Sequence, residues 1–417
     1  MLIAKKLSVP VNLALRGLAL ASRFSLSFYI VKFLGLDAAG VYGLTLGIIS
    51  SAPAILGWGL NYFVSRDIIG TSQESAGIEV RNRLIVTTLT LAVATALCML
   101  CAVAAGYPIS VLFILVVVIV WMETYACDVH ASLISLEKPV LANVLFFIRS
   151  SFWIPLIIAA GIFFPQTRTL EFMYWAWAVS YFLMASVFWR AVRDWPIAAI
   201  VRAPIPIEWL TRRLKSSWPI YISDLSNVGF VYIDRYLVSF YLGLTLTGVY
   251  TFYWSLTNAV QTLLLTAVVQ VSFPKLFKAH SQNEMGRWRE VMRRQFLKVA
   301  VLSVVFGAGM LFASEILFHI MGMSELGEHR AVFILLLLAA ITRSCCDLLS
   351  VGLTSLRKDR YFVFLKLFSV FTSVVMVTAL VPFFGLVGAG IGALITAIAV
   401  MLVGAVSFIK HSKERPT

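Results

Sequence analysis

Charged residues are scarce in this sequence. Asp, Glu, Lys and Arg make up 13% of the 417 residues, whereas hydrophobic residues make up 60% and the mean hydropathy is +0.91. Soluble domains contain about 25% charged residues, so this composition excludes an ordinary soluble fold. Apolar stretches of about 20 residues recur along the chain, which is the length that carries a helix across the roughly 30 Å hydrocarbon core of a bilayer. We therefore expect an all-α polytopic membrane protein.

Cysteine is also rare, and its placement excludes a disulfide framework. The five cysteines all fall inside apolar stretches: Cys98, Cys101, Cys127, Cys345 and Cys346. The first two have the spacing of half a zinc or redox motif, but no second Cys or His pair accompanies them. We interpret them as packing residues and expect neither a metal site nor a cofactor.

The sequence lacks the features of an enzyme active site. It contains no phosphate-binding loop, metal cluster or nucleophile arrangement, and the longest outer connection, MGMSELGEHR, has only about ten residues. A membrane-embedded polysaccharide polymerase or ligase needs a substantial outer loop that carries its active site. This absence disfavours that class, and we expect a protein that is not an enzyme.

The apolar runs predict about twelve transmembrane helices. Their expected ranges are 9–34, 41–63, 84–105, 110–134, 140–164, 172–190, 218–242, 248–272, 296–320, 331–354, 361–382 and 387–408. Most of the 34 Lys and Arg residues fall in the connections on one side, whereas the opposite connections hold Arg168 and Arg330. Basic connections face the cytoplasm, so both termini are predicted to be cytoplasmic. The net charge of +14 reflects this topology and contact with anionic lipids, not nucleic-acid binding.

Two segments of the chain are nearly repeated. Residues 33–43 read FLGLDAAGVYG and residues 241–251 read YLGLTLTGVYT, while LISLEKP at 133–139 is echoed by LTSLRKD at 353–359. The first pair is expected at the outer turn of a helix hairpin, with Gly40 and Gly248 allowing the reversal. The repeats predict two parallel six-helix pseudo-symmetric halves, 1–205 and 206–417, around a central cavity. This is the architecture of a transporter that works by alternating access.

The same residues carry a family resemblance. The stretch RGLALASRFSLSFYIVKFLGLDAAGVYGL, the segment GWGLNYFVSRD and the SL.K loop after the fourth span resemble the polysaccharide transporter family of the multidrug/oligosaccharidyl-lipid/polysaccharide (MOP) exporter superfamily. The resemblance is strongest to the O-antigen and exopolysaccharide flippases and covers the whole chain.

That resemblance implies a cargo, an energy source and a location. The cargo is undecaprenyl-pyrophosphate-linked oligosaccharide, moved from the inner to the outer leaflet of the bacterial inner membrane, and the coupling ion is H+ or Na+. We expect a monomer. The sequence does not decide whether it works beside polysaccharide polymerase or glycosyltransferase partners. The alternative is a drug or cation antiporter of the MATE type from the same superfamily, in which intramembrane acids rather than arginines control activity.

Cationic side chains occur where they are costly, inside the predicted spans. An ionised group near the bilayer centre faces a cavity, a partner or a substrate, because its desolvation costs several kcal/mol, on the order of 3 to more than 10. Arg16 and Arg23 are seven residues apart and therefore share one face of the first span. Arg149, Arg235 and Lys366 add further cations. These five residues predict a cationic cavity that binds pyrophosphate, while pairing with carboxylates to hold helices together is the alternative.

Four carboxylates inside the spans are candidates for ion coupling: Asp224, Asp128, Glu123 and Asp234. An acid held away from water can load and release a proton. Asp224 lies 208 positions after Arg16, so these pseudo-symmetric counterparts have opposite charge and are predicted to be able to meet.

Two further expectations concern neighbours on a helix. Arg343 and Asp347 have the i to i+4 spacing of a local ion pair, whereas Asp234 and Arg235 point to different sides of their helix. Tyr and Trp residues among polar residues of the seventh and eighth spans suit a glycan passage, and an interfacial aromatic belt is the alternative.

The loop KAHSQNEMGRWREVMRRQF is predicted to be a basic amphipathic helix on the inner leaflet, with Trp288 and Phe296 as its apolar contacts.

Overall fold

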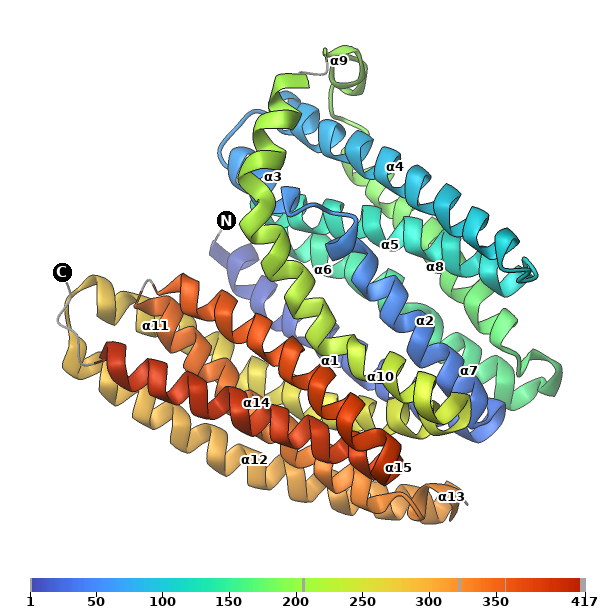
Figure 1. Ribbon diagram of the computed structural model, residues 1–417. Helices are drawn as coiled ribbons and strands as arrows, with labels where there is room; N and C mark the ends of the chain where they lie inside the picture. The colour runs from blue at the N-terminus through green and yellow to red at the C-terminus, as the bar shows by residue number, and fades with distance from the viewer. Residues whose placement is uncertain (1, 205–206, 322–323, 357, 413–417) are drawn as a thin grey trace. The chain divides into compact units, whose positions relative to one another are not determined.

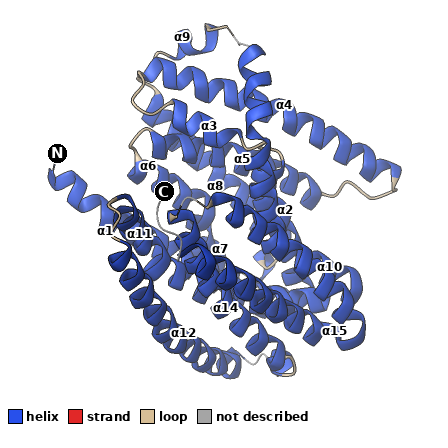
Figure 2. Ribbon diagram, turned by 60° about the vertical axis from the view of Figure 1, so that its left-hand side comes forward, coloured by secondary structure: helices blue, strands red, loops and turns tan. Residues whose placement is uncertain are grey.

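The computed structural model describes residues 2–204, 207–321, 324–356 and 358–412. These residues form helices and connecting loops and no strand (Figure 2). Ten of the helices are long and apolar enough to cross a membrane. The expected all-α polytopic membrane fold is confirmed.

Figure 1 follows the chain from α1 to α15. The elements up to the linker are α1 (Leu2–Tyr29), η1 (Ile30–Leu34), α2 (Leu36–Ile55), α3 (Leu60–Asp67), α4 (Gln73–Ala104), α5 (Val111–Ser135), α6 (Pro139–Phe147), η2 (Ile148–Phe152), α7 (Trp153–Phe163), η3 (Pro165–Thr167), α8 (Leu170–Val192) and α9 (Ile197–Arg202). After it come α10 (Ile207–Leu264), η4 (Leu265–Val269), α11 (Gln270–Ser281), α12 (Met285–Met321), α13 (Ser324–Gly327), α14 (Arg330–Ser355) and α15 (Asp359–Ser412).

Two of the long helices are hairpins. Gly243 in α10 (φ 81°) and Gly385 in α15 (φ 58°) have left-handed backbone conformations that interrupt the helix. After Gly243 the chain runs back along itself, because Tyr250 contacts Asp234 and Trp254 lies against Tyr232. Counting each hairpin as two passes reconciles the ten helices with the twelve predicted spans.

The chain divides into two compact units that do not follow the midpoint of the sequence. Unit 1 contains residues 1–29 and 45–228, and unit 2 contains residues 30–44 and 229–417. Helices α2 and α10 each contribute one part to each unit. The predicted halves, 1–205 and 206–417, describe a repeat in the sequence, whereas the compact units describe which residues lie close together. The two homologous halves therefore remain a prediction.

The repeated segments meet each other inside unit 2. The Thr245 hydroxyl donates a hydrogen bond to Asp37, its counterpart 208 positions earlier. A Cβ atom at Gly40 would collide with the Leu244 carbonyl, and one at Gly248 with the Leu36 carbonyl. The repeat therefore folds into a close crossing of α2 and α10.

The expectation that Gly40 and Gly248 make the reversals is wrong. Both lie inside helices at the crossing, whereas Gly35 (φ 91°) and Gly243 (φ 81°) adopt the left-handed conformation at the turns. The physical reason is that a tight reversal needs positive φ, while a close helix crossing needs only the absence of a side chain.

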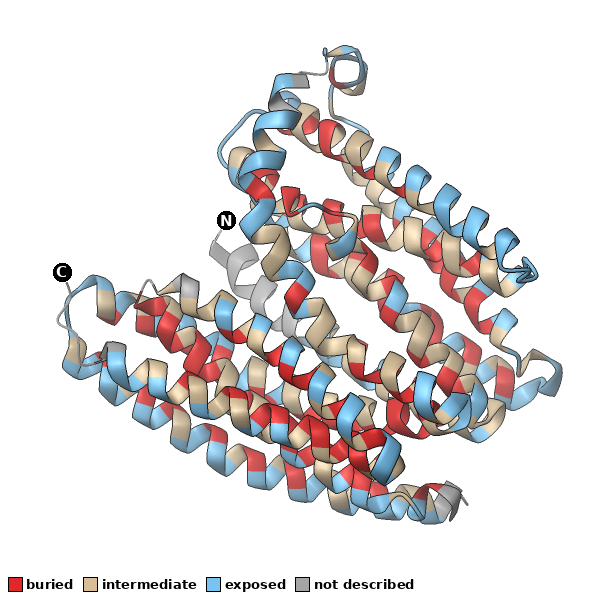
Figure 3. Ribbon diagram, viewed as in Figure 1, coloured by how far each residue is buried: buried red, intermediate tan, exposed pale blue. Residues whose placement is uncertain are grey.

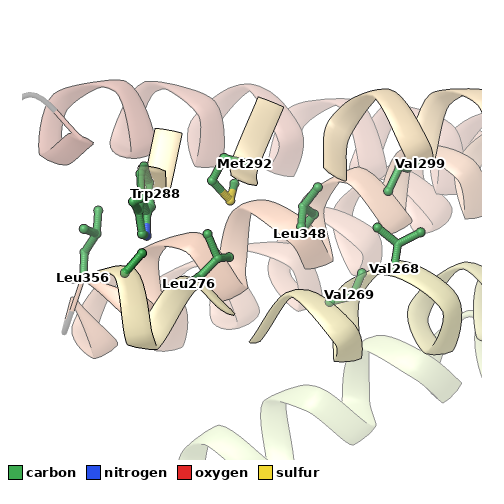
Figure 4. Close-up of a cluster of buried hydrophobic side chains, with 9 residues drawn as sticks. Val268, Val269, Leu276, Trp288, Met292, Val299, Leu348 and Leu356 are labelled. Carbon is green, nitrogen blue, oxygen red and sulfur yellow. The ribbon is translucent and has the colours of Figure 1, made fainter. Parts of the chain in front are cut away.

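Burial follows the packing of each helix. Figure 3 shows buried residues along α14, whereas α4 and α12 are buried along one side and exposed along the rest. In unit 2, α14 packs along α15, and α11, α12 and α14 share a hydrophobic cluster (Figure 4).

The segment 278–296, predicted to be a basic amphipathic helix on the inner leaflet, forms the end of α11 and the start of α12. Trp288 is 1% exposed, its indole nitrogen donates to the Ser355 hydroxyl at 2.9 Å, and its ring stacks on Phe408. Figure 4 shows Trp288 within the cluster beside Met292. Trp288 therefore anchors this helix to its own protein and is not an apolar contact with lipid.

Candidate functional site

Arg149 lies on a π-helical turn, η2, in the middle of the fifth predicted span. Such turns widen the helix and are frequent at functional sites. The Arg149 side chain is 5% exposed and forms an ion pair with Glu123 of α5, which also accepts a hydrogen bond from the Tyr181 hydroxyl of α8. The structure thus joins one predicted cargo residue to one predicted coupling residue.

Arg23 lies beside this pair on α1, which packs along α6 and η2. Its residue is exposed, and its guanidinium carbon lies 5.7 Å from the centre of the Phe146 ring. The guanidinium carbon of Arg149 lies 5.3 Å from the same ring. Phe146 therefore lies against both cations.

Arg16 extends the cluster along the same face of α1. It is exposed, and its Nε donates a hydrogen bond to the Asn143 side chain at 3.4 Å. Three predicted cargo residues, Arg16, Arg23 and Arg149, are thereby brought to one region of unit 1, and Glu123 is the carboxylate paired there. We call these three residues the arginine cluster. Its net charge is positive, and a phosphate oxygen is the ligand that guanidinium groups bind best.

The predicted meeting of Arg16 with Asp224 does not occur in the structure. Arg16 contacts Asn143 instead, and Asp224 is exposed without a hydrogen-bond or ion-pair partner among the described residues. The two side chains share a unit, but they belong to different helix neighbourhoods.

Asp128 forms a second buried ion pair in unit 1. The Arg83 guanidinium donates to it at 3.1 Å and the Thr87 hydroxyl at 2.6 Å, and both charged side chains are 1% exposed. Arg83 Nε also donates to the Asn61 side chain at 3.0 Å. The pair is fully removed from water.

Arg83 and its partner Asn61 are not identified from the sequence, because the predicted span 84–105 begins one residue after Arg83 and places it in a connection. An available signal is that Arg83 lies in the third turn of a helix capped by Ser72 and is followed by 21 uncharged residues, 84–104.

Unit 2 buries Arg235 without a polar partner. Its three guanidinium nitrogens have no hydrogen bond among the described residues, and the residue is 1% exposed. The guanidinium carbon lies 3.8 Å from the centre of the Trp254 ring and 4.9 Å from that of Tyr232. These aromatic faces hold the cation electrostatically.

Asp234 has partners other than its neighbour Arg235, as the helix geometry predicts. It accepts hydrogen bonds from the Ser373 hydroxyl and, at 3.2 Å, from the Tyr250 hydroxyl. Arg343 Nη2 lies 3.8 Å from the same carboxylate.

The predicted local pair Arg343 and Asp347 is absent from the ion pairs of the described residues. Arg343 turns toward Asp234, while Asp347 accepts a hydrogen bond from Gln261 at 3.2 Å. The carboxylate of Asp234 on α10 is held in place by two hydroxyl donors, so it is available to pair with Arg343. The carboxylate of Asp347 already accepts a hydrogen bond from the Gln261 amide.

Lys366 lies in the same part of unit 2 and has no carboxylate partner among the described residues. Its ammonium nitrogen lies 6.0 Å from the centre of the Phe230 ring, whose other close cation is Arg343 at 4.8 Å. Arg16, Arg23 and Arg149 thus belong to unit 1, and Arg235 and Lys366 belong to unit 2.

The described residues contain no group of three His, Cys, Asp or Glu side chains that could hold a metal ion. The five cysteines are free, and Cys98 and Cys101, expected to be packing residues, lie on the exposed side of α4.

Comparison with known proteins supports the fold. No protein-family model matches the chain. A multidrug-resistance MATE family transporter of the MOP superfamily in an inward-facing conformation superposes with a TM-score of 0.71 at 17% identity, covering 94% of this chain and 95% of that one. An outward-facing structure of such a transporter gives 0.60 at 18% identity, covering 97% and 94%.

Two further similarities extend beyond drug transporters. A MOP superfamily transporter from Pyrococcus furiosus, described as having a binding pocket of reversed polarity that suggests a different function, gives a TM-score of 0.56 at 15% identity over 98% of this chain and 95% of that one. The probable flippase AglR of Haloferax volcanii is 24% identical over 185 residues, which are 43% of this chain. The match spans 38% of the length of that relative.

These findings define the fold. The chain is a multi-pass membrane protein with the fold seen in MATE family transporters of the MOP superfamily. The expected MATE-like fold is confirmed.

Proposed function

We propose that this protein is a flippase that moves an undecaprenyl-pyrophosphate-linked oligosaccharide from the inner to the outer leaflet of the bacterial inner membrane by alternating access. The arginine cluster carries the proposal, because Arg16 and Arg23 are exposed inside an apolar span and Glu123 is the one carboxylate of the described residues that forms an ion pair with the cluster. A diphosphate group neutralises such cations through several charge-assisted hydrogen bonds. The similarity to a probable flippase supports the flippase assignment.

The ion pair between Arg149 and Glu123 suggests how transport is coupled to an ion gradient. A proton or a sodium ion on Glu123 neutralises the carboxylate and releases Arg149 for the diphosphate. Departure of the ion restores the pair and expels the cargo. In this exchange Glu123 is the coupling residue, which binds the ion. Arg149 pairs with Glu123 when the ion is absent and with the diphosphate when the ion is bound.

The proposal is tested by reconstituting the protein in liposomes with a fluorescent undecaprenyl-pyrophosphate oligosaccharide and measuring its accessibility to a quencher. We expect Arg23→Gln to lower the rate about tenfold or more, because a charge-assisted hydrogen bond contributes about 1.5 to 3 kcal/mol. Arg193→Gln is the control, since Arg193 is 69% exposed and pairs with its neighbour Asp194.

A cation antiporter is the second candidate, favoured by the similarity to multidrug transporters and by the buried carboxylates Asp128 and Asp234. Full flipping activity of Arg23→Gln would contradict the cargo assignment. Efflux of ethidium that survives Arg23→Gln and disappears in Asp128→Asn or Asp234→Asn would place the protein in the antiporter class.

A further inference from the structure

Helix α2 ends before the end of the predicted second span, 41–63. It ends at Ile55, after 20 residues, which is long enough to cross a membrane, and α3 begins at Leu60, so residues 56–59 are not helical. This turn lies in unit 1, where the chain leaves one helix and enters the next.

Trp58, at the centre of the turn, has a strained backbone. Its φ is 53°, in the left-handed region that bulky residues rarely adopt, and Gly59 follows with φ 66°. Such strain persists only where the surroundings hold it, and it is concentrated at functional sites. A glycine at position 58 would relieve it, so the indole ring has a use that outweighs the strain.

The surroundings hold Trp58 in place from two helices. Gly59 lies directly on α10, because a Cβ atom there would come within 2.9 Å of the Tyr221 nitrogen. The Tyr221 hydroxyl donates to the Ile55 carbonyl at 3.0 Å, which satisfies a carbonyl at the end of α2. The Trp58 indole nitrogen donates to the Thr90 hydroxyl at 3.3 Å.

The result is a row of three aromatic rings. Trp58 and Tyr221 stack with centroids 5.3 Å apart and an interplanar angle of 24°. Trp218, one turn earlier on α10, lies 5.6 Å from Tyr221 on a tilted plane. The two tryptophans at the ends of the row remain open, with Trp58 37% and Trp218 56% exposed. We call Trp58, Tyr221 and Trp218 the aromatic platform.

An acidic side chain adjoins the platform. Asp224 follows Tyr221 by one turn of α10, is exposed, and has no hydrogen-bond partner among the described residues. Flat apolar rings beside an open carboxylate suit a ligand that has both apolar faces and hydroxyl groups. A hexose is such a ligand, because its C–H faces pack on aromatic rings while its hydroxyls donate hydrogen bonds.

We propose that the aromatic platform binds the glycan of the cargo through stacked hexose rings, with Asp224 accepting hydrogen bonds from sugar hydroxyls. This inference rests on the proposed function, which places the diphosphate at the arginine cluster of the same unit. The platform lies near the end of α2 that the Lys and Arg distribution predicts to be cytoplasmic, where the glycan is assembled before it crosses.

An interfacial aromatic belt does not account for Trp58. Belt tryptophans project from regular helices, and Trp189, 60% exposed on α8, is a tryptophan of that kind. A belt requires no tryptophan in the left-handed conformation. Trp189 therefore serves as the matched control for a tryptophan that is exposed but not strained.

The test measures dissociation constants in nanodiscs for two probes, undecaprenyl pyrophosphate and the same carrier bearing a hexose tetrasaccharide. Trp58→Leu and Trp218→Leu are expected to weaken binding of the glycan-bearing carrier about tenfold and to leave the sugar-free carrier within about twofold. Trp189→Leu should change neither. Equal weakening of both carriers, or of neither, would overturn the proposal.

A second variant separates binding from folding. Trp58→Gly removes the ring, with its stacking on Tyr221 and its hydrogen bond to Thr90, and relieves the left-handed backbone. These effects oppose each other, so the variant should remain folded and keep the affinity of the wild type for the sugar-free carrier while glycan affinity falls. Glycan affinity equal to that of the wild type in the folded variant would overturn the platform. Loss of tetraphenylphosphonium binding in place of glycan binding would assign the rings to a cation.

The two proposals can fail separately. Wild-type protein that binds neither carrier would overturn the proposed function. The platform is then judged with free maltotetraose, because stacking on hexose rings requires no lipid. Binding that Trp58→Leu weakens would retain the platform, and binding that is absent or unaffected would overturn it.

Discussion

At the scale of single residues, the charged side chains inside the spans have three kinds of surroundings. Arg83 and Asp128 neutralise each other in a fully buried pair, Arg235 is enclosed by aromatic rings, and Arg23 stays exposed. Only the third arrangement leaves a cation available for a ligand without first breaking an existing contact. Whether a charged residue is a candidate for ligand binding or for a structural role therefore depends on the partners of its side chain, and its presence in a span does not decide this.

The Arg83 and Asp128 pair is expected to be structural. Arg83→Leu or Asp128→Leu leaves an uncompensated buried charge, which should lower the free energy of unfolding by about 3 to 5 kcal/mol. The double variant Arg83→Leu/Asp128→Leu should recover most of that loss. Thermal unfolding in detergent, followed by tryptophan fluorescence, measures all three in a double-mutant cycle. Additive losses would show that the two side chains do not act as a pair.

At the scale of elements, one short pattern makes three helix reversals. The sequence GLxxxG occurs at 35–40, 243–248 and 385–390, and its first glycine has positive φ each time. Its last glycine lies at a close helix contact, since a Cβ atom at Gly390 would come within 3.1 Å of Leu335. The pattern thus combines a turn with a crossing, which explains why the chain repeats it.

The crossing predicts a sharp difference between glycines. Gly248→Leu should destabilise the protein by at least about 1 to 3 kcal/mol, because the new side chain collides with the Leu36 carbonyl. Gly309→Leu in α12 is the control, since nothing lies within 4 Å of a Cβ atom there and leucine favours a helix. The two variants are compared by the fraction that elutes as monodisperse protein after heating. Equal survival of both would argue against a close crossing.

At the scale of the whole molecule, the sequence predicted the membrane class and the approximate number of spans, because hydropathy is a local property of the chain. It did not predict which glycine turns and which one crosses, since both kinds occur in a single short motif. It also did not predict the partners of Arg343 or Trp288. Those partners depend on the orientation of helices that are far apart in the sequence. Residue spacing within one helix does not determine that orientation.

The crossing also joins the two sequence repeats, and this has a consequence for transport. Asp37 precedes the midpoint of the chain and Thr245 follows it, yet both lie in unit 2 and share a hydrogen bond. Under the proposed function, alternating access rocks one six-helix half against the other. Rocking that parts the two halves at the predicted outer turns would open this contact and close it once in each cycle.

A disulfide at this contact is therefore expected to stop transport. Asp37→Cys/Thr245→Cys is made in a variant whose five native cysteines are replaced, because all five are free thiols. Oxidation should form the bond readily, since the native side chains already touch, and should reduce flipping in proteoliposomes at least about tenfold until a reductant restores it. Each single cysteine variant controls for the effect of oxidation itself. Full transport by the cross-linked protein would show that the repeats stay together throughout the cycle, and that the motion occurs elsewhere in the chain.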